Sequence, residues 1–147
     1  MFLLATMAMM GGCSSWIIKN KTESEVNLKI NEKRLINIQQ LTFFGENAEA
    51  YFSSDGESLI FQSRDGDSLC DQIYIMKIKT REKALVSTGN GVSTCAYFEH
   101  PGCENIIYSS IHLGDIKCPP KPDYSRGYVW LLYPDYDIFH SKKMGRI

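Results

Sequence analysis

The sequence predicts an all-β fold that is built from short antiparallel strands. Residues 45–88 contain four apolar runs separated by turn residues, and each run has the length of a strand, not of a helix. The runs cover residues 50–52, 59–61, 73–76 and 84–86. They are rich in β-branched and aromatic side chains, which favour strands. This stretch is therefore expected to form one four-stranded antiparallel sheet.

The first two runs read as a β-hairpin. Asp55-Gly56 lies between them, and a glycine at this place supplies the positive φ that a tight turn needs. The turn fixes which residues of the two strands pair.

The same pattern begins again, and the early matches are 45 to 47 residues apart in the sequence. The matching segments are Leu41-Thr42 with Val86-Ser87, Ala50-Tyr51-Phe52 with Ala96-Tyr97-Phe98, Gly56 with Gly102, Ile60-Phe61 with Ile107-Tyr108, and Ile73-Tyr74 with Ile138-Phe139. A repeat of this length with four strands is typical of β-propeller blades. Near-continuous apolar runs suit such blades, because neighbouring blades cover both faces. We expect about two blades, at residues 41–88 and 89–147.

At these residues the chain resembles the TolB-like propellers with WD40-like repeats that occur in bacterial envelopes. Blades of that family carry Gln-Leu-Thr, then Phe-Ser-Pro-Asp-Gly, then Gln-Ile-Tyr-x-Met. Here the segments are Gln40-Leu41-Thr42, Phe52-Ser53-Ser54-Asp55-Gly56 and Gln72-Ile73-Tyr74-Ile75-Met76. Ser54 replaces the usual proline, and the second copy of the turn reads Glu99-His100-Pro101-Gly102. The resemblance covers residues 35–147 and implies a non-enzymatic binding or scaffold protein with an envelope or cell-wall-associated partner.

Length and charge narrow the possibilities further. A propeller needs at least about four blades of roughly 45 residues. A chain of 147 residues is therefore expected to be a fragment, or to have its other blades supplied from elsewhere. The net charge is −1, from 16 basic and 17 acidic side chains, so the chain has no strong field for nucleic acid or an anionic membrane surface.

The first 13 residues differ from the rest of the chain. A short apolar segment ends in Gly11-Gly12-Cys13, which resembles a bacterial lipobox, although Met10 stands where leucine is usual and no basic residue precedes it. The segment is too short to span a bilayer. Residues 14–34 are polar and read as a tether. We therefore expect lipidation at Cys13 and a lipid-anchored, periplasmic protein.

Four further cysteines suggest disulfides, since exported proteins use them. They are Cys70, Cys95, Cys103 and Cys118, which allow three pairings. Cys70 with Cys95 is the preferred pair, because the first lies before the third strand of one blade and the second before the first strand of the next.

Two other uses of these thiols remain open. Cys95, Cys103 and Cys118 with His100 or His112 would supply zinc ligands, but no C-x-x-C or H-x-x-x-H spacing supports a metal site. The thiols would stay reduced in a cytoplasmic scaffold protein.

Residues 111–133 form a long insertion between the second and third strands of the second blade. Connections of this length are uncommon in compact domains and are usually functional or disordered. The insertion contains three prolines and the candidate binding residues Tyr124, Arg126, Tyr128 and Trp130. Aromatic rings and arginine are enriched where proteins bind partners. A stiff loop that packs on its own blade is the alternative interpretation.

No catalytic site and no cofactor are predicted. Residues 91–95 resemble a nucleophile elbow, but the last glycine is Cys95 and no strand-to-helix context surrounds it. Asp135 and Asp137 suggest a cation site, yet Asp137 occupies the place of Gln72 in the repeat. We therefore expect a binding protein. The propeller portion of a prolyl-oligopeptidase-like enzyme or metallopeptidase, with its catalytic domain outside this chain, is the alternative.

Overall fold

The all-β prediction is confirmed by a computed structural model that describes residues 34, 36–65, 70–129 and 132–143. Within these residues there are seven strands and no helix. No described helix is therefore long and apolar enough to cross a membrane. All the strands belong to one compact unit, residues 39–147, whereas the predicted lipobox with Cys13 lies outside the described residues.

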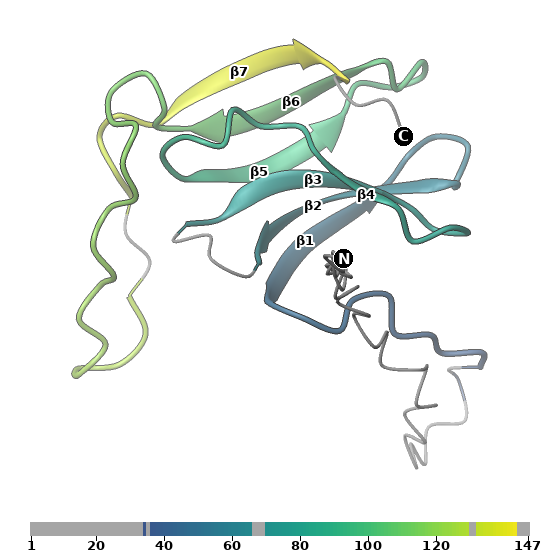
Figure 1. The fold of residues 1–147 in the computed structure, drawn as a ribbon, viewed down its shortest axis with the longest axis horizontal. Coiled ribbons are helices and arrows are strands. Elements are labelled where there is room, and N and C mark those ends of the chain that lie inside the picture. The colour runs from purple at the N-terminus through teal and green to yellow at the C-terminus, as the bar shows by residue number, and fades with distance from the viewer. Residues whose placement is uncertain (1–33, 35, 66–69, 130–131, 144–147) are drawn as a thin grey trace, which may run out of the picture. The chain divides into compact units, whose positions relative to one another are not determined.

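The first sheet contains the four strands expected from the first repeat. They are β1 (Glu46–Phe52), β2 (Ser58–Arg64), β3 (Gln72–Lys77) and β4 (Lys83–Leu85), paired antiparallel in chain order (Figure 1). The β1–β2 turn closes as predicted, because Gly56 has a φ of 71° and its N–H donates to the Ser53 carbonyl at 2.9 Å.

The second sheet repeats the first three strands. It consists of β5 (Ser93–Phe98), β6 (Asn105–Ser110) and β7 (Asp137–Lys142), paired antiparallel in the order β5-β6-β7 (Figure 1). Ser63 pairs with Gln72 in the first sheet and Ser110 pairs with Asp137 in the second. The predicted match of residues 73–74 with 138–139 is therefore confirmed by the strand register.

A bulge recurs at the same place in both sheets. The β1–β2 register shifts between Ala48 and Tyr51, and the β5–β6 register shifts between Thr94 and Tyr97. Within these bulges Glu49 and Cys95 have φ values of 51° and 53°. A conformation that is rare for residues other than glycine thus occurs twice, 46 residues apart in the sequence. The two hairpins are therefore structural repeats of each other.

The match of Gly56 with Gly102 is wrong by one residue. Cys103 has the positive φ of 52° in the second turn, and its N–H donates to the Glu99 carbonyl at 2.9 Å. Phe98 pairs with Ile106, so the second turn is one residue longer than the first. This extra residue moves the left-handed position past the glycine.

The two sheets pack together through apolar side chains. Ile60, Ile73 and Ile75 on the first sheet are fully buried, and they belong to one cluster with residues of the second sheet. Those residues are Ala96, Phe98, Cys103, Ile106 and Tyr108. The opposite face of the first sheet is also buried, at Leu59, Phe61 and Met76, with Leu41 packed against it.

The second sheet leaves one apolar face exposed. Tyr97, Ile107 and Ile138 are 48%, 40% and 77% exposed. By strand register, Ile107 and Ile138 correspond to the buried Ile60 and Ile73. The Tyr97 ring also contacts the Tyr51 ring of the first sheet, with centroids 4.8 Å apart. We therefore call Ile107 and Ile138 alone the outer face of the second sheet.

The register correspondence provides a matched test of sheet packing. Ile73→Ala should lower the free energy of unfolding by about 2–5 kcal/mol, because it leaves a cavity among buried side chains. Ile138→Ala removes the same atoms from the equivalent but exposed position and should cost less than about 1 kcal/mol. Urea denaturation of the two variants measures the difference, and equal costs would mean that the two sheets do not pack as described.

Candidate functional site

A cleft of about 370 Å³ lies where the start of β1, the end of β2 and the β6–β7 connection meet. The strands and their neighbours contribute Glu46, Gln62, Arg64, Cys70, Asp71, Val92 and Thr94. The β6–β7 connection, residues 111–136, contributes Cys118, Pro119, Pro120, Lys121, Pro122, Tyr124, Tyr128, Val129, Tyr133 and Tyr136. Both the rigid sheets and the long connection therefore form its walls.

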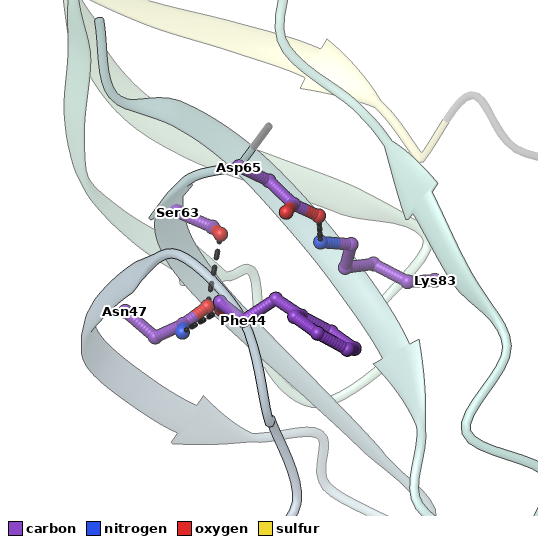
Figure 2. A network of polar contacts seen from close by, with 5 residues as sticks. All are labelled: Phe44, Asn47, Ser63, Asp65 and Lys83. Carbon is purple, nitrogen blue, oxygen red and sulfur yellow. Dashed lines mark hydrogen bonds and ion pairs between the residues drawn. The ribbon is translucent and has the colours of Figure 1, made fainter. Parts of the chain in front are cut away.

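The wall formed by the strands is held by polar contacts between neighbouring strands. The Asn47 side chain donates to the Phe44 carbonyl at 2.9 Å and accepts a hydrogen bond from Ser63 Oγ at 2.9 Å (Figure 2). Next to these two residues, Glu46 and Arg64 form an ion pair across β1 and β2. The strand ends that carry this ion pair are thus fixed relative to each other.

Two further side-chain contacts involve β2 or the residue that follows it. Lys83 forms an ion pair with Asp65, and Figure 2 shows the lysine side chain reaching that carboxylate. Thr94 Oγ1 donates to Gln62 Oε1 at 2.5 Å, which joins β5 of the second sheet to β2 of the first. Side chains of both sheets therefore have fixed positions in the cleft wall.

The long connection is tied back to the first sheet. Cys118 forms a disulfide with Cys70, whose Cα lies 5.5 Å away, in the β2–β3 connection. The Gly91 N–H donates to the Ile116 carbonyl at 2.9 Å, and a Cβ at Gly91 would lie 2.6 Å from the Asp115 carbonyl oxygen. Figure 1 shows the connection as the long green loop between the end of β6 and the start of β7. Its first part is therefore anchored by a covalent bond and a close backbone contact.

Tyrosines form two ring pairs in the connection. The rings of Tyr124 and Tyr128 are stacked, with centroids 6.4 Å apart and planes at 20°. Those of Tyr133 and Tyr136 are tilted by 46°, with centroids 5.8 Å apart. Tyr124 and Tyr128 remain 52% and 85% exposed, so their faces are available to a ligand.

Burial shifts two titratable groups in this cleft. It raises the pKa of Asp71, an effect that the nearby Arg64 opposes and that Glu46 strengthens. Burial also raises the pKa of Tyr136 to about 12, with smaller contributions from the charges of Tyr133, Cys95 and Asp71. Tyr136 therefore keeps its proton at neutral pH and can donate a hydrogen bond.

The predicted binding residues divide into three groups. Tyr124 and Tyr128 line the cleft. Arg126 is exposed and does not line it. Trp130 lies outside the described residues. Whether these side chains contact a partner stays a prediction.

The preferred pairing of Cys70 with Cys95 is wrong, because the structure joins Cys70 to Cys118. Cys95 is an exposed free thiol in the β5 bulge, and Cys103 is a buried free thiol that accepts a hydrogen bond from the Ser54 N–H at 3.2 Å. The spacing of cysteines carries no information on a loop that folds back onto the preceding blade, so the sequence favoured the pair across the blade junction.

The other chemical alternatives find no support in the described part of the chain. No three His, Cys, Asp or Glu residues there lie together as a metal site requires. The proposed zinc set is also broken by the disulfide at Cys118. Ser93, in the elbow-like segment, begins β5, is fully buried and donates to Ser110 Oγ at 3.0 Å.

Most of the polar residues of the cleft were not predicted from the sequence. Arg64 and Asp71 border the short β2–β3 connection, and Tyr133 and Tyr136 end the long β6–β7 connection. Both connections join the second and third strands of their sheets, so the repeat itself places them at the same end. That equivalence was the signal that could have identified these residues.

The cysteine arrangement can be checked by mass spectrometry. Without reduction, the proteolytic peptides that contain Cys70 and Cys118 should be joined, and iodoacetamide should label native Cys95 but label Cys103 only after unfolding. Because burial raises the pKa of the Cys95 thiol, its labelling should accelerate as the pH rises above neutral, where the thiolate fraction grows. A peptide that joins Cys70 to Cys95 would contradict the structure.

Comparison of the chain with family models, with curated proteins and with solved structures found no match.

Proposed function

We propose that the chain is a non-enzymatic binding protein of the bacterial cell envelope, built from TolB-like propeller blades. In this proposal the cleft at the end of the two sheets binds an extended polypeptide segment of an envelope or cell-wall-associated protein. The observation that carries the proposal is the cleft itself, in which two pairs of tyrosine rings lie beside polar side chains of the strands.

The repeated strand register supports the blade interpretation. The bulges at Glu49 and Cys95 and the equivalent pairings of Gln72 and Asp137 give both sheets one plan. The outer face of the second sheet adds to this, because its equivalent in the first sheet is covered by another sheet. A further blade would cover the outer face in the same way.

The aromatic composition of the cleft supports peptide binding. Tyrosine buries a large apolar area at a small cost in side-chain entropy and still offers a hydroxyl group for hydrogen bonds. Aromatic-lined grooves bind extended, proline-containing segments, whose conformation is already restricted before binding. In propellers, the connections at the rims are free to vary without disturbing the sheets, so they are suitable places for such a groove.

The disulfide supports a location outside the cytoplasm, since disulfides persist in oxidising compartments. A periplasmic protein with a lipid anchor would have this property. Lipidation of Cys13 remains a prediction from the sequence.

The cleft can be tested with paired tyrosine variants. A double variant with Tyr124→Ala and Tyr128→Ala should weaken capture of an envelope partner by about thirtyfold or more, because truncating an aromatic anchor typically costs about 2 kcal/mol or more. The measurement is quantitative pull-down from envelope extract, with circular dichroism to confirm that the double variant and each single variant keep the fold.

Leu113→Ala is the matched control for this experiment, because Leu113 lies in the same connection, is 75% exposed and does not line the cleft. It should leave capture unchanged. Arg126→Ala reports separately on the outer surface of the connection. If the tyrosine variants capture the partner as well as the wild type does, the cleft is not the binding site.

The outer face of the second sheet leads to another prediction. The isolated chain should bind a hydrophobic dye and self-associate through this face, and Ile138→Lys should reduce both effects, because a charge disfavours contact between apolar surfaces. Ile116→Lys is the control, since Ile116 is 67% exposed but lies in the β6–β7 connection. Dye fluorescence and light scattering measure the outcome, and equal effects of both variants would remove this support for a missing blade.

A further inference from the structure

Asp71 places a carboxylate in the cleft without a protein partner. The residue precedes β3, and its backbone is fixed because its carbonyl accepts a hydrogen bond from the Ser93 N–H at 2.9 Å. Its side chain is partly buried and makes no hydrogen bond or ion pair with any described residue. A partly desolvated carboxylate in this situation gains stability from any cation that reaches it.

Arg64, whose charge lowers the pKa of Asp71, already has an ion-pair partner. Arg64 forms its ion pair with Glu46, so these two charges largely compensate each other. Lys121 is the other basic residue that lines the cleft, and its exposed position places it at the rim. The wall formed by the strands therefore retains the negative charge of Asp71.

Aromatic rings lie close to this carboxylate. Tyr133 and Tyr136 line the same cleft as Asp71, and their ring centroids are 5.8 Å apart. The charge of Asp71 is also the smallest of the contributions that raise the pKa of Tyr136. Ring faces attract cations through their quadrupole, and they also cover the apolar stem of a long basic side chain. Carboxylate and rings together have the chemistry that recognises an ammonium or guanidinium group.

We propose that the cleft recognises a basic side chain, lysine or arginine, in the segment that it binds, with the cationic head at Asp71 and the stem along the Tyr133 and Tyr136 rings. This inference rests on the proposed function, and it specifies the chemistry of the bound segment. A neutral or acidic side chain at the same place would leave the carboxylate unpaired.

Two synthetic peptides that differ in one charge test the proposal. The probes are acetyl-Ala-Pro-Lys-Pro-Ala-amide and the same peptide with norleucine in place of lysine, measured by surface plasmon resonance on the immobilised full chain. The lysine peptide should bind about tenfold more tightly, because it adds an ion pair in a partly buried site. Asp71→Asn should abolish this preference, and Asp71→Glu should retain it.

Asp123→Asn is the matched control, because Asp123 is exposed and its carboxylate accepts a hydrogen bond from the Ser125 N–H at 2.9 Å, outside the cleft lining. It should leave the preference unchanged. Equal binding of both peptides, or a preference that survives Asp71→Asn, would overturn the basic-residue inference while the peptide-binding function stands. If neither peptide binds, the inference is also overturned, and the pull-down with the tyrosine variants decides separately on the proposed function.

Discussion

Apolar contact between the two sheets is the interaction on which the other features depend. Each fully buried isoleucine contributes about 1.5–3 kcal/mol relative to an exposed one, and Ile60, Ile73 and Ile75 meet the second sheet at zero exposure. This packing brings β5 next to β2, which allows Thr94 to reach Gln62. The cleft walls can be shared between the sheets only because this contact fixes their distance.

The two sheets share a strand plan but differ in one connection. Residues 65–71 join β2 to β3, whereas residues 111–136 join β6 to β7. Because both connections leave the same end of their sheets, the longer one can reach the shorter one, and the bond between Cys70 and Cys118 holds them together. The longer β6–β7 connection thus forms part of a cleft, while the strand register stays equivalent in the two sheets.

The electrostatics of the cleft follow from this arrangement. Strand ends supply the ion pair of Glu46 and Arg64, the short connection supplies the partly buried Asp71, and the long connection supplies tyrosine rings to the same cleft. A carboxylate with partly dry surroundings interacts more strongly with a nearby cation than a carboxylate on an open surface does.

Local sequence patterns were enough to predict the strands of the first sheet and their repeat in the second. Apolar runs of strand length and turn residues are local signals, and segments such as residues 50–52 and 96–98 recur along the chain. The all-β class and the place of the insertion were therefore predicted. Three features became visible only in the folded chain. They are the disulfide pair, the one-residue shift of the left-handed position to Cys103, and the presence of Asp71 and Tyr136 in one cleft. These features depend on the path of a 26-residue connection and on the packing of separate sheets, and neither leaves a periodic pattern in the chain.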